Sequence, residues 1–440
     1  MFTSNPLKID TVTIIGATGT MGASVAGIFA SFGNAKVYLV GRDINKVRNT
    51  IPRIIKSVRA DSIEKNLIPA DFSALEECVR ESDLIFESAA EDIGIKENIA
   101  HTVAGAMRKD AISCTGTSGL SVTRLAECYP EGLRERFLGM HFFNPPYNMP
   151  LCELIPTEYS DRAVGSEVSE YLKSVLLRTV VPVKDSPAFL GNRIGFQFIN
   201  EALQYAERYK DYGGIDYIDA ILGPFTGRSM APLVTSDFVG LDVHKAIVDN
   251  VYQNTNDYAH ETFVLPAFVQ KLIDEKKLGR KTNAGLYRLI KEDNGSRRQM
   301  VLDLNTGAYR ELIPYAFPFA DKMKKYIAEG DYAKAFERLV NNRSQEAEIC
   351  LSFLLKYIMY SLYAAKEVGD SVHSADDVMA TGFNWCPPLA MVQALSTVAD
   401  VKALIRERLS DVCGQVDVEE LLESIEPSGY DYRPYFKSAR

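Results

Sequence analysis

Residues 11–22 read TVTIIGATGTMG, and this stretch decides the fold. Its first half, residues 11–16, is apolar or β-branched and ends at a glycine, which predicts a buried strand. Residues 24–32 continue with helical spacing, and KVYLV at 36–40 predicts a second strand. A strand, a glycine-rich turn and a helix in this order predict a parallel sheet covered by helices on both faces.

The glycine-rich turn has the chemistry of a phosphate-binding loop. Gly16 allows the tight turn, Gly19 lets the backbone approach a ligand, and Gly22 lets the helix pack closely on the strand. Thr20 and Met21 begin the helix, whose free N–H groups and partial positive charge favour a pyrophosphate. The spacing is GxxGxxG, so the loop is one residue longer than the usual dinucleotide pattern, and an ordinary glycine-rich turn is the alternative interpretation.

The end of the second predicted strand bears on the choice of cofactor. An NAD site usually places a carboxylate there to hold the ribose 2′-hydroxyl, but Gly41 occupies this place and Arg42 follows. A small residue followed by arginine makes room for a 2′-phosphate and neutralises it, which favours NADP(H). The alternative is that Asp43 supplies the carboxylate with a shifted register, and the sequence leaves both interpretations open.

Strands and helices alternate up to about residue 186, which predicts a dinucleotide-binding domain over residues 1–186. Beyond Pro187 long helical patterns dominate, for example at 193–209 and 263–276. Further strands are predicted from DLIFES, AISCT, an apolar run and VVPVKD, at residues 83–88, 111–115, 137–143 and 180–185.

The helical half of the chain contains a repeat. TGRSMAPL at 226–233 resembles TGFNWCPPL at 381–389, and each follows a helix and an acidic residue, Asp219 or Asp377. We interpret this as a duplicated helical module, with the second copy packed on the first about a pseudo-twofold axis in a monomer or homodimer. The expected parts are a first module, a linker in which QMVLDLNTGAYREL forms a β-hairpin, and a second module, at residues 187–295, 296–344 and 345–440.

Composition excludes several classes of protein. The net charge of −9 disfavours nonspecific binding to nucleic acid. No apolar run approaches the ~20 residues of a membrane span, and residues 1–10 lack a signal pattern. The 7 cysteines are scattered without a CxxC pair, so we expect reduced thiols, no metal site and a cytoplasmic location.

His141 is the strongest candidate for a catalytic base. It lies in GMHFFNPP at the end of a strand-like run, where doubly wound sheets place their active sites. Glu153 follows in LCELI, and a carboxylate orients an imidazole and makes it more basic. Ser118 in the small-residue loop TGTSGLS and Asn192 at the junction of the domains add polar groups. A purely structural histidine is the alternative.

These segments together resemble the 3-hydroxyacyl-CoA dehydrogenase family. The resemblance runs from about residue 11 to residue 290, and the later stretch is similar to the dehydrogenase half of hydratase–dehydrogenase fusion enzymes. It implies a Rossmann-type α/β domain followed by two related all-α modules like the C-terminal domain of 6-phosphogluconate dehydrogenase. The matching motifs are the glycine loop, FESAAEDIGIK, TGTSGLS, GMHFFNPP, LCELIP, DSPAFLGNRIG and LGRKTNAGLY.

The resemblance implies reversible, NAD(H)-dependent oxidation of a (3S)-3-hydroxyacyl-CoA to a 3-oxoacyl-CoA, a reaction of fatty acid β-oxidation. His141 would take the proton of the 3-hydroxyl group, and Glu153 would stabilise the imidazolium that forms. Ser118 and Asn192 match residues that hydrogen-bond near the reacting oxygen. The acyl-CoA substrate is the only small-molecule partner expected beyond the cofactor.

The resemblance also implies that Glu91, Lys96 and Asn144 line or contact the cofactor cleft. The chain departs from the family at Gly116, where asparagine is usual, and in a shortened segment after Arg42. A basic run there favours a seat for cofactor or CoA phosphates, and a solvated helix face is the alternative. Its members are Arg42, Lys46, Arg48, Arg53, Lys56 and Arg59, against Asp43 alone.

Two other functions stay open. One is dehydrogenation of a non-CoA hydroxy acid or sugar acid, as in the crystallin-like branch of the family. The other is a catalytically silent, nucleotide-binding scaffold, against which the set of serine, histidine, glutamate and asparagine described above argues.

Overall fold

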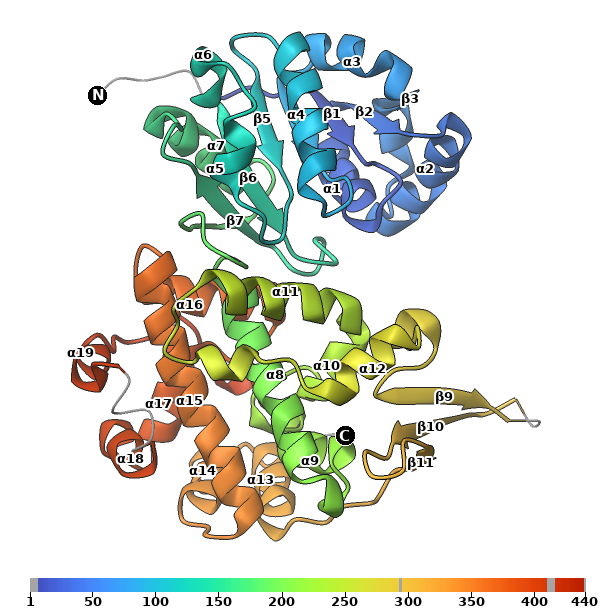
Figure 1. Cartoon of the computed structure of the whole chain (residues 1–440). Coiled ribbons are helices and arrows are strands. Elements are labelled where there is room, and N and C mark those ends of the chain that lie inside the picture. The colour runs from blue at the N-terminus through green and yellow to red at the C-terminus, as the bar shows by residue number, and fades with distance from the viewer. Residues whose placement is uncertain (1–6, 293–294, 410–415, 439–440) are drawn as a thin grey trace. The chain divides into compact units, whose positions relative to one another are not determined.

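The contacts of the chain form two compact units, and each is described by itself. The first unit runs to Phe189 and takes in two later segments, residues 368–370 and 381–383. The second unit begins at Leu190 and holds the remaining residues, drawn mainly in green to red in Figure 1. The structure is a computed structural model, and it describes residues 7–292, 295–409 and 416–438.

The first unit is built on an eight-stranded sheet of order β3-β2-β1-β4-β5-β6-β7-β8. Neighbouring strands in this sheet are parallel except for β6 and β7, which are antiparallel. The central strands are buried throughout, as expected of a sheet covered on both faces. The strands are β1 (Thr11–Ile15), β2 (Lys36–Gly41), β3 (Leu67–Asp71), β4 (Leu84–Glu87), β5 (Ile112–Thr115), β6 (Phe137–Phe142), β7 (Leu151–Pro156) and β8 (Thr179–Pro182).

Helices cover both faces of this sheet. α1 packs on α2, and Phe29 of α1 stacks on Tyr171 of α7 at 6.5 Å between ring centroids, so these helices share one face. On the other face α3 contacts α4, and α4 contacts α5 (Figure 1). The helices are α1 (Thr20–Ser31), α2 (Ile44–Val58), α3 (Leu75–Glu81), α4 (Ile93–Ala106), α5 (Val122–Ala126), α6 (Glu131–Arg134) and α7 (Arg162–Ser174).

All six strands predicted for this unit are present, and the predicted Rossmann-type fold is confirmed. The prediction omitted β3 and did not assign the LCELI segment, which is β7, to a strand. β3 contains Pro69, which weakens a strand signal. Proline is tolerated there because β3 lies at the sheet edge and pairs only with β2.

Helices dominate the second unit, as predicted. The two longest, α8 and α15, pack together through Phe198 and Phe353, whose rings lie 5.1 Å apart, and through an ion pair of 2.8 Å from Lys356 to Glu201. The helices are α8 (Gly191–Arg208), α9 (Ile215–Ile221), α10 (Pro232–Val239), α11 (Leu241–Asn254), α12 (Ala267–Asp274), α13 (Pro318–Ala328), α14 (Tyr332–Val340), α15 (Gln345–Val368), α16 (His373–Val378), α17 (Pro388–Ser396), α18 (Val401–Arg408) and α19 (Val418–Glu423).

One described helix, α15, is long and apolar enough to cross a membrane by length and composition. Of its most apolar window 78% is buried inside the protein, so packing accounts for its composition. α17 and α18 are long and apolar enough to cross a membrane only when they are taken together as one span, and the two helices are bent by 101° relative to each other.

The predicted repeat has a structural counterpart in two buried aspartates that cap helices. Asp219 accepts hydrogen bonds from the backbone N–H groups of Leu233 and Val234 at the start of α10. Asp376 accepts one from Leu389 at the start of α17. Burial raises the pKa of Asp219 to about 7 and that of Asp376 to about 6. The sequence comparison paired Asp219 with Asp377, which is wrong by one residue.

The two matching loops of the predicted repeat also touch one another. The N–H of Cys386 donates to the carbonyl of Gly227 at 2.7 Å, which joins the two matching loops. Next to this contact the buried guanidinium of Arg228 lies 3.8 Å from the ring centroid of Phe198 and 4.7 Å from that of Trp385. Contact between like elements, here the two loops and the helices α8 and α15, is what a pseudo-twofold arrangement requires.

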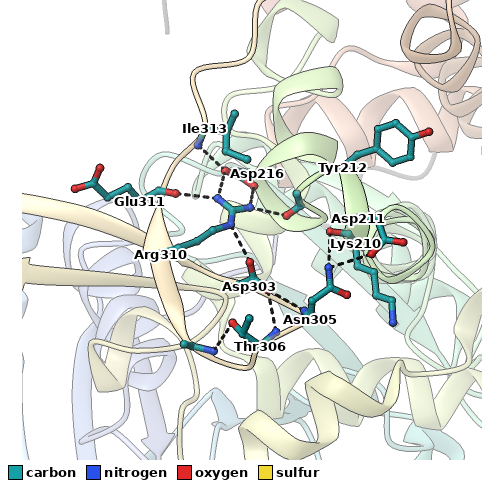
Figure 2. Close-up of polar contacts among 12 residues, drawn as sticks. Lys210, Asp211, Tyr212, Asp216, Asp303, Asn305, Thr306, Arg310, Glu311 and Ile313 are labelled. Carbon is teal, nitrogen blue, oxygen red and sulfur yellow. Dashed lines mark hydrogen bonds and ion pairs between the residues drawn. The ribbon is translucent and has the colours of Figure 1, made fainter.

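The segment expected to be a linker, residues 296–344, is more ordered than predicted. Its hairpin is present as β10 (Arg297–Leu302) and β11 (Tyr309–Glu311), and β9 (Tyr287–Lys291) adds a third antiparallel strand. Figure 2 shows how Arg310 fastens this sheet to α9, with hydrogen bonds of 2.7 and 2.9 Å to the two carboxylate oxygens of Asp216. Helices α13 and α14 follow, so this segment is an integral part of the second unit.

Candidate active site

The candidate residues of the first unit gather at one edge of its sheet. β1, β4, β5 and β6 are neighbours and parallel, so their carboxyl ends lie side by side. The glycine loop follows β1, Glu91 follows β4, Ser118 follows β5, and His141 and Asn144 lie at the end of β6. The chain order reverses between β1 and β4, which is where doubly wound sheets bind ligands.

The glycine loop fits a pyrophosphate. Gly16 has φ of +83°, and a Cβ atom there would lie 2.3 Å from the carbonyl oxygen of Ser88. A Cβ on Gly22 would lie 2.5 Å from the carbonyl oxygen of Gly16, so the helix could not approach the turn as closely. Gly19 caps α1 without a side chain, which leaves the first-turn N–H groups of α1 free for an anion.

The end of β2 carries no carboxylate available for a ribose in the usual place. A Cβ on Gly41 would meet Val47 Cγ2 at 2.7 Å and Thr18 Cγ2 at 3.2 Å, so little more than hydrogen fits there. Asp43 is the N-cap of α2, and its Oδ1 accepts from the N–H groups of Asn45 and Lys46 at 2.9 and 3.2 Å. This capping role opposes the interpretation that Asp43 replaces the ribose carboxylate.

His141 and Glu153 form a buried pair across the antiparallel strands β6 and β7. They are register partners, and Nδ1 of His141 lies 2.7 Å from Oε2 of Glu153. The glutamate is 0% exposed and the histidine 4% exposed. Because an ionised carboxylate only accepts hydrogen bonds, Nδ1 carries the hydrogen, and Nε2 keeps its lone pair. A histidine held in this way is suited to act as a base.

Aromatic rings fix the imidazole from two sides. The rings of Phe143 and Phe189 lie 4.6 and 5.5 Å from that of His141 between centroids. Phe189 and the preceding Ala188 have φ values of 52° and 61°, the left-handed region that side chains avoid. No pattern in the sequence predicted the role of Phe189, because all of β7, α7 and β8 lie between it and His141 along the chain.

A second buried cluster supports the loops beside the histidine. Lys96 on α4 is 1% exposed, and its ammonium lies 2.9 Å from Glu87 and 3.5 Å from Glu91. Glu91 accepts hydrogen bonds from the hydroxyl of Thr117 and from the backbone N–H of Ser118. Glu87 was not among the predicted site residues, although a carboxylate inside an apolar strand already indicates a buried partner.

The structure gives the surroundings of Lys96 and of Gly116. The ammonium of Lys96 is buried and lies 3.5 Å from Glu91, and its contact with a cofactor stays a prediction. At Gly116 a Cβ would lie 2.6 Å from Cζ of Phe86, so asparagine could not take this place without a shift. Asn144 is exposed at the end of β6.

Asn192 lies in the first turn of α8 and is 7% exposed, within the second unit.

Six cysteines, Cys78, Cys114, Cys128, Cys152, Cys350 and Cys386, are free, and Cys413 lies outside the described residues. The described part of the chain holds no group of three or more histidine, cysteine or acidic side chains placed to bind a metal ion.

Comparison with known proteins identifies a family that the chain matches in both units. Residues 11–186 match the family model described as 3-hydroxyacyl-CoA dehydrogenase, NAD binding domain. Residues 189–289 match the C-terminal domain of the same family. The first match includes the glycine loop and the His141–Glu153 pair, and the resemblance predicted from the motifs is confirmed.

Individual relatives agree with the family models. A probable 3-hydroxyacyl-CoA dehydrogenase of Bacillus subtilis is 28% identical over 393 residues, which cover 84% of this chain and 48% of that protein. The chain thus spans about half the length of this curated relative. A probable 3-hydroxyacyl-CoA dehydrogenase of Caenorhabditis elegans is 32% identical over 300 residues, covering 64% of this chain and 93% of that one.

A solved structure extends the likeness of the fold to nearly the whole chain. The 3-hydroxybutyryl-CoA dehydrogenase from Escherichia coli K12 superposes with a TM-score of 0.69 at 20% identity. The match covers 95% of this chain and 99% of that one, so the shared fold includes the region of the repeat.

We predict that His141→Gln leaves the fold and nucleotide binding intact but lowers kcat by roughly 10²–10⁴, because a positioned base is lost. Glu153→Gln, which removes the charge but keeps a hydrogen-bond acceptor, should lose a comparable part. Thermal unfolding and a nucleotide-binding titration serve as controls for folding. Near-normal turnover in either variant would contradict the assignment of an acid–base pair.

Proposed function

The chain belongs to the 3-hydroxyacyl-CoA dehydrogenase family, and from this premise we propose that it catalyses the reversible oxidation of a (3S)-3-hydroxyacyl-CoA to the 3-oxoacyl-CoA. Residues 11–186 are the NAD-binding domain of the family. The observation that carries the proposal is the buried pair of His141 and Glu153, 2.7 Å apart, at the sheet edge that also holds the glycine loop. This edge thus combines a phosphate cradle with an oriented base.

Proton transfer is the task of His141 in this reaction. When bound, the nicotinamide supplies the acceptor for the hydride that leaves C3 of the substrate. Nε2 of His141 takes the proton of the 3-hydroxyl group, and the C3–O single bond becomes a carbonyl. Glu153 accepts the hydrogen bond from Nδ1 and stabilises the imidazolium. In the reverse direction the imidazolium returns its proton to the oxygen.

Ser118 orients the reacting oxygen. The backbone N–H of Ser118 donates to Glu91 at 2.8 Å, which fixes the loop that carries this serine. The side-chain hydroxyl of Ser118 is then left for the substrate. Asn192 is the second residue of α8, and its part in the reaction rests on the family resemblance alone. Fixing such groups in advance lowers the entropic cost of reaching the reactive geometry.

NAD(H) is the cofactor that the family model supports, and NADP(H) is an additional one that the end of β2 favours. NADP(H) is favoured mainly because no carboxylate would repel its 2′-phosphate: the position at the end of β2 is Gly41, and the carboxylate of Asp43 caps α2. Arg42 is exposed and has no partner in the described part of the chain, so its guanidinium is available for a phosphate.

We place the enzyme in the cytoplasm as a monomer or homodimer.

A substrate panel tests the proposed function. The enzyme is offered 3-hydroxyacyl-CoA thioesters of several chain lengths, the free 3-hydroxy acids and sugar acids, each with NAD and with NADP. Formation of reduced nicotinamide should depend on the thioester and on the (3S) configuration. Faster turnover of free acids would favour the non-CoA alternative, and nucleotide binding without any turnover would favour the silent scaffold.

We predict that Arg42→Leu selectively weakens NADP(H), since it removes a charge-assisted contact with the 2′-phosphate. The kcat/KM with NADP should fall several-fold, by roughly the worth of one exposed charged hydrogen bond, while kcat/KM with NAD stays nearly constant. NAD is thus the internal control. An equal fall for both cofactors, or no change in either, would show that Arg42 does not recognise the 2′-phosphate.

A further inference from the structure

Arg53 reaches from α2 back to the glycine loop. Its Nη2 lies 3.0 Å from the carbonyl oxygen of Thr18 and 3.5 Å from that of Gly19. These two residues form the last part of the loop, directly before the first turn of α1. The contact is possible because α1 and α2 pack against each other along one face of the sheet.

The charge of Arg53 is not neutralised by the protein. Its side chain is exposed, and the two loop carbonyls are its only partners among the described residues. A guanidinium has five N–H donors in a fixed plane, so most of them remain free while Nη2 is anchored. Other cations on α2, such as Arg48 and Lys56, are exposed and make no hydrogen bond to the loop in the described structure.

This placement has an electrostatic consequence for the loop. The carbonyl oxygens of Thr18 and Gly19 carry partial negative charge next to the helix N-terminus that is suited to an anion. By donating to them, Arg53 offsets that charge and brings a full positive charge beside the first turn of α1. An anchored guanidinium also loses less conformational entropy when it binds a phosphate than a freely moving one.

We propose that Arg53 is a binding and positioning residue for the diphosphate of the dinucleotide, acting on NAD(H) and NADP(H) alike. The inference rests on the proposed function, because it assumes that the glycine loop holds a dinucleotide. It differs from the proposed role of Arg42, which would distinguish the two cofactors by the 2′-phosphate. Arg53 instead acts on the part that both cofactors share.

The test is a set of binding titrations on the intact protein with NADH, NADPH, ADP-ribose and AMP as probes. Arg53→Gln should weaken NADH, NADPH and ADP-ribose by about the same factor, roughly five- to tenfold, because all three carry the diphosphate. AMP, which has one phosphate, should lose less. The matched control is Lys65→Gln, which removes one exposed positive charge from the same unit without touching the loop and should change each affinity less than twofold.

Several outcomes would overturn the inference. Unchanged affinity in Arg53→Gln would do so, as would an equal loss in Lys65→Gln, which would reduce the effect to overall charge. A loss confined to NADPH would assign Arg53 to the 2′-phosphate instead. Thermal unfolding without ligand shows whether the variant folds, and Arg53→Lys, which keeps the charge, should recover part of the affinity. If the unaltered protein bound none of the probes, the proposed function itself would fail.

Discussion

The antiparallel pairing of β6 with β7 is the constraint on which the rest of the proposed site depends. Its register places His141 directly opposite Glu153, and both side chains are buried. A slip of one residue would move one of them to the other face of the sheet. Such a slip would leave the buried carboxylate without its hydrogen-bond partner, which costs about 1–3 kcal/mol or more, so packing and chemistry favour the same register. The orientation of the base is therefore set by the backbone.

The parallel strands add the second half of the site. Because β1, β4, β5 and β6 are neighbours, the loops that carry the phosphate cradle, Glu91, Ser118 and His141 share one edge. The buried ammonium of Lys96 lies between Glu87 and Glu91, and Glu91 connects the loop after β4 with the loop that carries Ser118 by accepting the N–H of Ser118. In the second unit two buried aspartates, Asp219 and Asp376, accept hydrogen bonds from backbone N–H groups at the starts of α10 and α17.

The sequence predicted those features that follow from local patterns. The glycine loop, six strands and the pairing of His141 with Glu153 all have a signal in spacing or in a motif. Contacts between side chains of different elements have no such signal in the sequence. Examples are the contact of Arg53 with the glycine loop and that of Phe189 with His141. The register of the repeat was wrong by one residue, because two adjacent aspartates, Asp376 and Asp377, fit the pattern equally well.

Transfer of the substrate's own C3 hydrogen to the cofactor is the central chemical claim, and isotopic labelling measures it directly. A (3S)-3-hydroxyacyl-CoA carrying deuterium at C3 is oxidised with NAD, and the reduced nicotinamide is analysed by mass spectrometry. The deuterium should appear on the nicotinamide ring, and the 3-oxoacyl-CoA should have lost it. Reduced cofactor without deuterium, or no reduced cofactor at all, would contradict hydride transfer from C3 at this site.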